Sequence, residues 1–324
     1  MTFFNPLGAL LLITDLIKAK PTVLVLLASY NGARWIETQV ASILNQVDVD
    51  VSIIISDDHS NDCSQEILKK LDRANDNINV VFHEHGSGSA GQNFIWLITH
   101  SDFTGFDYVA FSDQDDVWYP EKLACGIGKF ADDFESGYSS SVNACWPNGK
   151  NKILTQSNLL RSADFLFEGA GQGCTFILGH KLVTRVQVFC TANRELVANF
   201  YYHDWLVYLL TRSWGLAWIF DDRSFMDYRQ HGFNDTGARG SLGAVSARLK
   251  LISEGWYKEQ INIAVNIWRC TGNRSLLIKN FSLVFLSQNS IGRKIKLFSF
   301  IVKYGRRKSI DRVVMAMSAL LGWI

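Results

Sequence analysis

Short apolar runs alternate with helix-like segments through the first 113 residues, and this alternation limits the possible fold more than any other feature. Residues 22–28 form a continuous β-favouring run, as expected of a strand buried on both faces of a parallel sheet. Apolar residues then follow helical spacing over 33–46, with Asn31 as the expected cap. The unit recurs, with strands expected at 51–56, 78–82 and 108–111 and helices at 62–74 and 90–100. This alternation predicts right-handed βαβ crossovers and a parallel sheet.

Polar turns follow three of the expected strands. They begin at Ser29, Asp57 and Asp113. Because ligands of open parallel sheets bind beyond the carboxyl ends of the strands, we expect these turns to converge on one crevice.

The strand and helix pattern loosens after a helix that is expected to begin near Pro120. Mixed short strands and loops continue to about residue 230, and we expect this part of the chain to close over the crevice. Three closely spaced glycines at 169, 171 and 173 suit either a close approach of the backbone to a ligand or a tight turn. The pattern divides the chain into a lead-in helix at 1–20, two halves at 21–117 and 118–239, and a helical extension at 240–324.

Charge, hydropathy and cysteine content exclude several classes of protein. With 32 basic and 31 acidic residues, the chain has no overall field that favours nucleic acid. It has no uninterrupted apolar run of about 18 residues, so a membrane-spanning helix is not expected. Six scattered cysteines without a Cys-x-x-Cys pair argue against a zinc site or a disulfide framework and favour reduced thiols in the cytosol. Cys174 is interpreted as a small buried side chain.

Two carboxylates, Asp113 and Asp115, lie one residue apart where the fourth strand ends. In an extended turn both side chains could point the same way, and clustered carboxylates repel one another unless a cation lies among them. The spacing is therefore compatible with a divalent metal site. The alternative is a solvated acidic turn with an aspartate that caps the next helix.

Six motifs occur in order between residues 22 and 235. They are 27–32 (LASYNG), 42–46 (SILNQ), 56–62 (SDDHSND), 111–123 (FSDQDDVWYPEKL), 202–205 (YHDW) and 228–232 (YRQHG). Together they resemble the family 2 glycosyltransferases of the GT-A fold, and most of all the bacterial rhamnosyltransferase-like enzymes that build surface polysaccharides. The segment after residue 240 lies outside this resemblance.

The resemblance implies an α/β fold of the GT-A type, in which a mostly parallel, Rossmann-like sheet is flanked by helices. The helical C-terminal extension follows this fold. In such enzymes the half at 21–117 binds the nucleotide sugar, and the half at 118–239 binds the acceptor and carries catalysis.

The resemblance also places the nucleotide. Its contacts match the first-strand turn, Ser29, Tyr30 and Asn31, with the tyrosine against the base. Asp57 and Asp58 match a pair of acids of which one accepts a hydrogen bond from the base, although a role in turn formation and helix capping is an alternative for them. His59 stands where the family usually has glycine.

The resemblance implies a divalent cation, Mn²⁺ or Mg²⁺, as cofactor. Asp113 and Asp115 match the metal motif, and Asp113 and Gln114 are assigned to the sugar diphosphate. His231 matches a histidine that completes the metal shell, and imidazole suits manganese better than calcium.

Asp204 matches the catalytic base of inverting members of the family. A carboxylate within hydrogen-bond reach can take the proton that an acceptor hydroxyl loses as it attacks the anomeric carbon. His203 replaces the family's usual glutamate, so only the second acid of that pair is present. The alternative is that Asp204 caps an expected helix at 205–211.

The resulting hypothesis is an inverting transfer of a sugar, with rhamnose as the family-level favourite, from a nucleoside diphosphate donor. The acceptor is expected to be a lipid-linked saccharide in surface polysaccharide or O-antigen synthesis. One competing function is a sugar-phosphate nucleotidyltransferase, which typically has a glycine-rich, basic phosphate loop that this chain lacks. The other is a non-catalytic carbohydrate-binding homologue. A nicotinamide dehydrogenase is disfavoured because Gly-x-Gly-x-x-Gly does not follow the first strand.

The last 32 residues carry a cluster of basic side chains. Interleaved with apolar residues, they favour an amphipathic helix on an anionic leaflet, with the enzyme peripheral at the inner face of the plasma membrane. A charged helix packed on the domain is the alternative. The basic residues are Arg293, Lys294, Lys296, Lys303, Arg306, Arg307, Lys308 and Arg312, and the apolar ones are Leu297, Phe298, Phe300, Ile301 and Val302.

Overall fold

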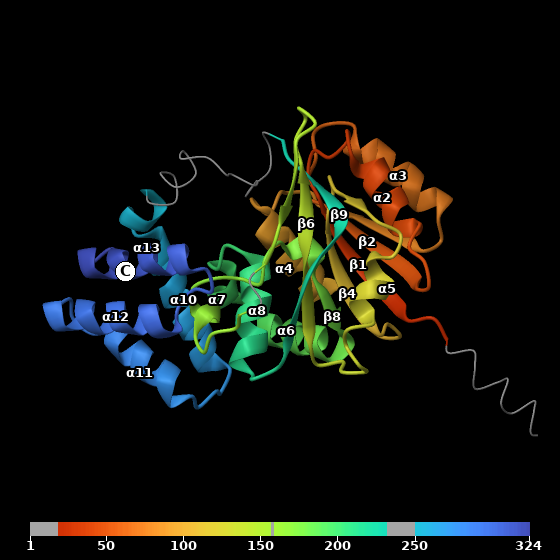
Figure 1. Ribbon diagram of the computed structural model, residues 1–324. Helices are drawn as coiled ribbons and strands as arrows, with labels where there is room; N and C mark the ends of the chain where they lie inside the picture. The colour runs from red at the N-terminus through yellow and green to blue at the C-terminus, as the bar shows by residue number, and fades with distance from the viewer. Residues whose placement is uncertain (1–18, 157–158, 232–249) are drawn as a thin grey trace, which may run out of the picture.

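A single nine-stranded sheet runs through the middle of the protein, with helices on both faces and a helical extension at one end (Figure 1). The computed structural model describes residues 19–156, 159–231 and 250–324. Most of the expected lead-in helix at 1–20, Gly232 of the last motif and the start of the extension lie outside these residues. Eight strands follow the order β3-β2-β1-β4-β8-β6-β9-β5, and β7 pairs with β6.

The first half of the sheet is parallel, as the sequence predicted. Its strands are β1 (Thr22–Ser29), β2 (Asp50–Asp57), β3 (Ile78–Phe82) and β4 (Tyr108–Asp113). The crossover helices are α2 (Ile36–Leu44), α3 (Ser64–Ala74) and α4 (Ala90–His100).

Strand β1 is apolar throughout because both of its faces are buried. Leu24 and Leu26 contribute to the core that includes α4, whereas Val23, Val25 and Leu27 contribute to the core that includes α2 and α3. Side chains of a strand alternate between its faces, so a continuous apolar run is the pattern that a strand between two helical layers requires.

The second half of the sheet mixes directions. Strand β8 pairs antiparallel with β4 and β6, whereas β6 pairs parallel with β9. Its elements are β5 (Val117–Trp118), α5 (Lys122–Ile127), β6 (Gly137–Cys145), β7 (Asn151–Leu154), η1 (Asp164–Leu166), η2 (Gly173–Thr175), β8 (Ile177–Gly179), α6 (His180–Ala192), α7 (Arg194–Ala198), α8 (His203–Ser213) and β9 (Trp218–Arg229).

Register brings the polar turns to one rim of the sheet. Ser29 at the end of β1 lies opposite Asp57 on β2, and its neighbour Ala28 lies opposite Asp113 on β4. The carboxyl ends of three adjacent parallel strands therefore meet side by side, and the expected convergence of the turns is confirmed.

The expected helix cap at Asn31 is wrong. Helix α2 begins at Ile36 with Trp35 at its N-cap position, and no side chain caps it. The Asn31 side chain instead accepts a hydrogen bond from the backbone N–H of Asn61, 2.9 Å away in the turn after β2. Asn31 also has a left-handed backbone, φ 51°, so it belongs to the turn and not to the helix.

Four helices lie wholly within the described part of the C-terminal extension: α10 (Trp256–Cys270), α11 (Leu276–Phe285), α12 (Ile291–Tyr304) and α13 (Ser309–Leu321). They lie at the end of the molecule farthest from α2 and α3 (Figure 1). Apolar residues of all four join the core on the α4 side of the sheet. Among the described residues, no helix has both the length and the apolar character that crossing a bilayer requires.

The prediction that the apolar residues of α12 at 297–302 face a membrane is wrong in part. Leu297 and Ile301 are fully buried in the core, and Phe298 and Phe300 pack against it, whereas Val302 is exposed. Arg293 is also buried, and its guanidinium donates to the backbone carbonyl of Phe285 at 2.8 Å and to that of Ile324 at 3.1 Å. This face of α12 is therefore an interior surface.

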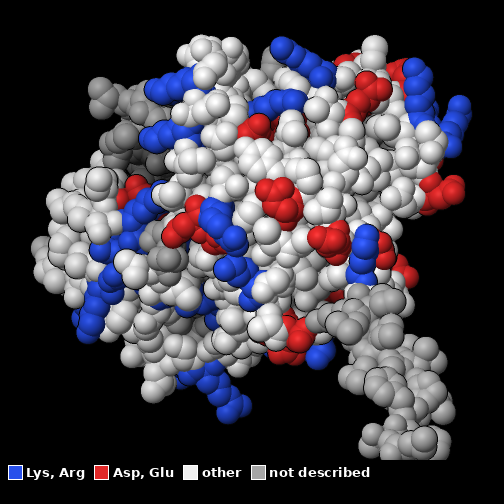
Figure 2. All heavy atoms as spheres, turned by 45° about the vertical axis from the view of Figure 1, so that its right-hand side comes forward, with Lys and Arg blue, Asp and Glu red and all other residues white. Residues whose placement is uncertain are grey.

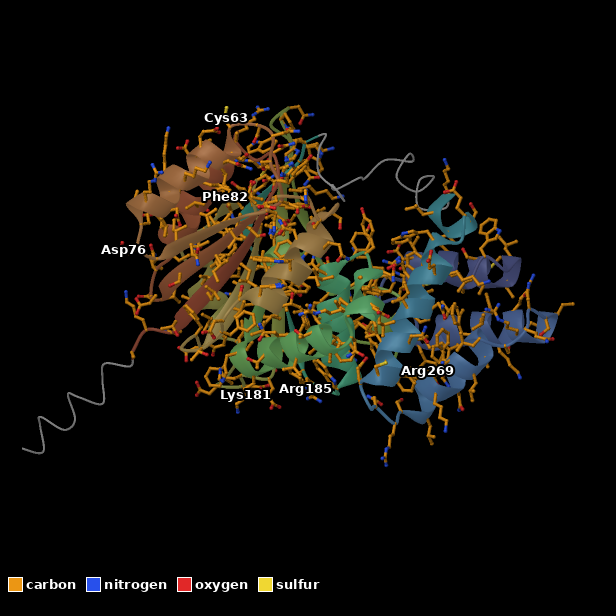
Figure 3. The ribbon with its side chains drawn as sticks, turned by 180° about the vertical axis from the view of Figure 1, so that it is seen from behind. Cys63, Asp76, Phe82, Lys181, Arg185 and Arg269 are labelled. Carbon is orange, nitrogen blue, oxygen red and sulfur yellow. The ribbon has the colours of Figure 1, made fainter. Side chains whose placement is uncertain are left out.

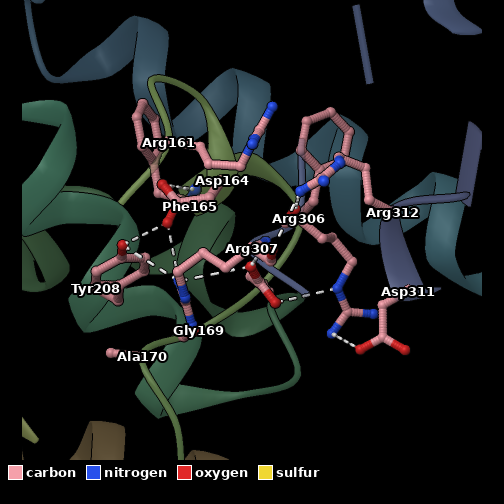
Figure 4. Close-up of polar contacts among 12 residues, drawn as sticks. Arg161, Asp164, Phe165, Gly169, Ala170, Tyr208, Arg306, Arg307, Asp311 and Arg312 are labelled. Atoms are coloured by element: carbon pink, nitrogen blue, oxygen red, sulfur yellow. Dashed lines mark hydrogen bonds and ion pairs between the residues drawn. The ribbon is translucent and has the colours of Figure 1, made fainter. Parts of the chain in front are cut away.

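Arg307 lies at the centre of a buried polar network that ties the turn between α12 and α13 to η1 (Figure 4). Its guanidinium donates to the Asp164 carboxylate at 2.9 Å and to the carbonyl oxygen of Gly169 at 2.6 Å. Asp164 is fully buried and also accepts from the hydroxyl of Tyr208 at 2.8 Å. Glu168 accepts from the backbone N–H of Arg307 at 2.5 Å. Arg307 thus links the C-terminal extension to residues 164–169 in the second half of the fold.

Charges elsewhere are interspersed. Basic and acidic side chains alternate over the face drawn in Figure 2, in keeping with the nearly equal totals in the sequence. All six cysteines are free thiols, and Cys63, which is exposed, lies at the N-terminal end of α3, at the edge of the molecule (Figure 3).

Replacing Arg307 with methionine is expected to lower the free energy of unfolding by about 3 kcal/mol, because the buried Asp164 carboxylate loses its main charged partner. Urea unfolding at neutral pH measures this change. Lys308→Met is the matched control: Lys308 is exposed, and its loss is expected to change stability by less than about 0.5 kcal/mol. Equal stabilities of the two variants would contradict the role of the network.

Candidate active site

Gln114 holds the turn after β1 in place. Its side-chain oxygen accepts from the backbone N–H of Tyr30, and its side-chain nitrogen donates to the Tyr30 carbonyl, both at 2.8 Å. The buried Ser29 hydroxyl adds a longer bond of 3.3 Å to the same amide oxygen. The Tyr30 ring remains 53% exposed at the rim. Gln114 thus joins two of the predicted turns and leaves an aromatic face open.

Gly32 is required by this arrangement. A Cβ atom at this position would lie 2.2 Å from the amide oxygen of Gln114. A larger residue would therefore displace Gln114 and release the turn that carries Tyr30.

The two acids at the end of β2, Asp57 and Asp58, both accept hydrogen bonds from serines of neighbouring loops. Asp57 is fully buried and accepts from the backbone N–H of Ser60 at 3.0 Å and from the Ser60 hydroxyl at 2.6 Å. Asp58 accepts from the N–H of Ser87 at 2.6 Å and from the Ser87 hydroxyl at 2.8 Å. A carboxylate has about four acceptor positions, so either acid retains capacity for a further donor. Asp58 is the more accessible of the two, at 6% exposure.

His59 occupies a position that favours glycine. Its φ of 65° lies in the left-handed region, which side chains with a Cβ adopt at a cost of about 1 kcal/mol. His59, which stands where the family usually has glycine, therefore adopts the backbone conformation of a glycine at the cost of local strain.

A second acidic group lies below the rim. Ligand atoms of Asp113, Asp116 and Cys174 lie within 4.8 Å of one another. Asp116 is fully buried, and neither of its carboxylate oxygens has a hydrogen-bond partner of ordinary geometry among the described residues. Burial, reinforced by the charges of Asp115 and Asp113, raises the pKa of Asp116 well above its ordinary value. Burial likewise raises the pKa of the Cys174 thiol.

Lys122 supplies positive charge beneath these acids. Its buried ammonium donates to the Cys174 carbonyl at 2.9 Å and lies 3.2 Å from the centre of the Trp118 ring. Burial lowers the pKa of Lys122 to about 7, while the nearby Asp116 acts in the opposite direction. Sequence reasoning missed this residue. The available signal was a lysine in the same motif as the acids, six residues after Asp116.

Asp115 and His231 meet as the sequence predicted. The His231 Nε2 lies 2.6 Å from a carboxylate oxygen of Asp115. The imidazole stacks on the indole of Trp35, with ring centres 4.2 Å apart and planes 8° from parallel. Trp35, which sequence reasoning had treated only as a helix residue, thus fixes the orientation of the histidine. Of the three predicted metal ligands, two are in direct contact, and Asp113 lies in the neighbouring group with Asp116.

Asp204 lies in the first turn of α8. One of its carboxylate oxygens accepts from the backbone N–H of Trp205 at 2.6 Å. The Asp204 side chain also lies against the chain at Gly173, where an added Cβ would be 3.3 Å from the Asp204 Cβ. Gly173, which lies against Asp204, and Cys174, which belongs to the acidic group described above, are consecutive residues. One short backbone segment therefore connects the expected base with the acidic group.

His203 cannot replace the missing glutamate as an acid or base. Its ring stacks on Phe94 at 3.9 Å, and its Nε2 is buried without a hydrogen-bond partner. A Cβ at Gly173 would lie 2.5 Å from that nitrogen, so the glycine makes room for the ring. Burial lowers the pKa of His203 to about 3, which keeps the imidazole neutral at physiological pH.

Comparison with known proteins agrees with this geometry. The family model for glycosyl transferase family 2 matches residues 24–200, which include the turns after β1, β2 and β4 but neither Asp204 nor His231. The dTDP-rhamnosyl transferase RfbG of Shigella flexneri is 33% identical over 296 residues, 91% of this chain and 99% of that protein. The chain belongs to glycosyl transferase family 2.

One more relative and one solved structure are similar to this family 2 glycosyltransferase. WfgD of Escherichia coli, a UDP-Glc:alpha-D-GlcNAc-diphosphoundecaprenol beta-1,3-glucosyltransferase, is 28% identical over 32% of this chain and 39% of its own. The structure of TarS 1-349 from S. aureus in complex with UDP-GlcNAc superimposes with a TM-score of 0.54 at 14% identity, over 93% of this chain and 89% of that one. The latter confirms the predicted fold class.

Stability of this family 2 glycosyltransferase is expected to depend on pH through His203. The unfolded chain takes up a proton near pH 6.5 that the buried ring excludes until about pH 3, so lowering the pH favours unfolding. This residue alone should remove about 2 kcal/mol of stability at pH 5.

Urea unfolding of the wild type and His203→Gln at pH 7 and pH 5 measures this contribution. The variant should lose less stability between the two pH values than the wild type does. His85→Gln is the control, because His85 is exposed and its removal should leave the pH dependence unchanged. An identical loss in the wild type and His203→Gln would show that the ring is not excluded from protons.

Proposed function

We propose that this glycosyltransferase transfers rhamnose, with inversion, from a thymidine diphosphate donor to a saccharide acceptor. The acceptor is lipid-linked, and the product belongs to a bacterial surface polysaccharide or O-antigen. The observation that carries the proposal is the 33% identity with the Shigella flexneri dTDP-rhamnosyl transferase, which extends over 91% of this chain and 99% of that protein. The diphosphoundecaprenol named in the acceptor of the Escherichia coli relative supports a lipid carrier.

The donor's base binds at the first-strand turn in this proposal. Tyr30 offers an exposed ring for stacking against the base, and two hydrogen bonds from the Gln114 side chain hold the Tyr30 backbone in place. Asp58, which is close to the surface and retains acceptor capacity, accepts a hydrogen bond from the base. Asp57, fully buried, holds the loop that positions Asp58 and Asn31.

The sugar diphosphate and a divalent cation bind at the end of β4. Asp115 and His231 are the principal ligands, with Asp113 in support, and this carboxylate and imidazole set suits Mn²⁺ or Mg²⁺. Two observations support the fit: Asp115 and His231 are already oriented toward each other, and the buried Asp116 beside Asp113 has no hydrogen-bond partner of ordinary geometry among the described residues. When bound, the cation supplies positive charge to the departing nucleoside diphosphate.

Asp204 is the catalytic base. The acceptor hydroxyl attacks the anomeric carbon on the face opposite the diphosphate, its proton passes to the Asp204 carboxylate, and the bond to the diphosphate breaks. The Asp204 carboxylate lies in the first turn of α8 and accepts from the Trp205 N–H, which holds the side chain in place. Neutral His203 beside it keeps a second charge out of the site.

Asp115→Ala is expected to abolish donor use, with transfer falling by at least about a hundredfold, because the donor diphosphate loses its cation. The measurements are thermal stabilisation by dTDP-rhamnose with Mn²⁺ and release of dTDP in the presence of acceptor. Uridine and guanosine sugar nucleotides serve as comparison donors. Asp222→Ala, at an exposed aspartate, is the control and should retain both signals. Release of pyrophosphate from a nucleoside triphosphate would instead indicate a nucleotidyltransferase.

Asp204→Asn is expected to bind donor normally while transfer falls by roughly 10²- to 10⁴-fold, because the amide cannot accept the hydroxyl proton. Donor-dependent thermal stabilisation and the rate of dTDP release separate these two effects. Near-normal turnover by Asp204→Asn would refute the assignment of the base.

A further inference from the structure

Exposed apolar side chains concentrate on the last three helices. Ten of the eighteen large apolar side chains that are exposed among the described residues lie between Leu276 and Leu321. Exposed apolar side chains that gather in one region of a folded chain indicate an interaction site, whereas single exposed apolar residues do not.

Helix α13 carries one continuous stripe of such residues. Ile310, Val313, Met317 and Leu321 are all exposed and follow one another at three- and four-residue steps, which places them along one side of the helix. Ile310 is 80% exposed. Met315, Ala316 and Ala319 on the opposite side are buried, so the core already has its own apolar contacts with α13. The outer stripe therefore adds nothing to the folding of the described chain.

Helix α12 carries a matching stripe. Ile291, Ile295 and Val302 are exposed on the side away from the buried Leu297 and Ile301. The two helices pack against each other. We call the seven outer residues the C-terminal apolar face: Ile291, Ile295 and Val302 of α12 with Ile310, Val313, Met317 and Leu321 of α13.

Lysines border this face. Lys296 directly follows Ile295 and Lys303 directly follows Val302, so each lies about 100° around the helix from an exposed aliphatic residue. Both lysines are exposed, as is Lys308 in the turn between α12 and α13. From there the long side chains can extend along an apolar surface while their ammonium groups remain hydrated.

Negative charge is nearly absent from the same region. Asp311 is the one acid between residues 291 and 321. It lies 3.9 Å from the guanidinium of the half-buried Arg306, which also pairs with Glu168 of the Arg307 network. The outward charge of the face is thus positive, which suits an anionic surface and opposes pairing with a second copy of the same positive face.

We propose that the C-terminal apolar face lies on the surface of an anionic phospholipid bilayer. The aliphatic side chains enter the boundary between headgroups and acyl chains, and the bordering lysines contact anionic headgroups. Helices of 14 and 13 residues lie in the plane of the surface and do not cross it. This surface is separate from the transfer site, so the inference stands whatever sugar is transferred.

Point substitutions test this face better than truncation does. Deleting the residues after about 290 would remove Leu297 and Ile301 from the core and Arg307 from its network, so loss of binding could follow from unfolding. Ile310 and Met317, by contrast, are exposed and can be replaced without loss of a buried contact.

The experiment measures sedimentation of the full chain with vesicles of phosphatidylcholine alone or with phosphatidylglycerol. The wild type should bind anionic vesicles strongly and neutral ones weakly, and added salt should weaken the binding. Ile310→Glu with Met317→Glu should reduce partition at least tenfold, and Lys296→Gln or Lys303→Gln by about fivefold each.

Val188→Glu on α6 is the matched control, because Val188 is an exposed aliphatic residue outside the face and its replacement should leave partition unchanged. Unchanged melting temperatures establish that the variants are folded. Wild-type protein that ignores anionic vesicles, or a double Glu variant that still binds them, would overturn the proposal. A lipid-free dimer that the double variant abolishes would also overturn it, since the face would then be occupied by a second copy. Donor-dependent stabilisation, measured separately, reports on the transfer site alone.

Discussion

The crowding of carboxylates at the end of β4 is the constraint on which the site depends. Asp113, Asp115 and Asp116 follow a buried strand within four residues, where like charges repel and water is scarce. Two side chains, one from each side of the cluster, lie close to these carboxylates. His231, brought by the end of β9 and held flat on an indole, meets Asp115 from above the rim, and the Lys122 ammonium lies beneath. In the proposed function, a divalent cation would supply further positive charge to these carboxylates.

The C-terminal extension reaches the same site through a short chain of contacts. Arg307 binds the carboxylate of Asp164 and the carbonyl of Gly169, at the two ends of a loop segment that continues to Gly173. Gly173 in turn lies against the side chains of His203 and Asp204. The extension therefore shapes the backbone on which the expected base depends, although it lies at the other end of the chain from the nucleotide half.

Local sequence patterns explain why the first half of the fold was predictable, whereas hydrogen bonds between residues far apart in the sequence were not. Strand β3 and helix α4 match the predicted ranges to the residue, because two-residue and 3.6-residue periodicities are properties of the segment itself. Asn31, by contrast, was misassigned as a cap because its partner is in the turn after β2. Arg307 and Asp164 are 143 positions apart, and nothing near either residue indicates the other. The same holds for the contact of Lys122 with the Cys174 carbonyl.

Helix α12 shows why composition alone could not orient the extension. The helix has two separate apolar stripes, with Leu297 and Ile301 on one and Ile295 and Val302 on the other, so its sequence is compatible with either stripe facing inward. Two kinds of cation also differ in position: Arg293 is enclosed among backbone carbonyls, whereas Lys296 and Lys303 are exposed. Guanidinium is more weakly hydrated than ammonium and offers five directed donors, so arginine is the better interior cation. The distribution of arginine and lysine, read separately, therefore distinguishes the inner side of α12 from the outer one where total positive charge does not.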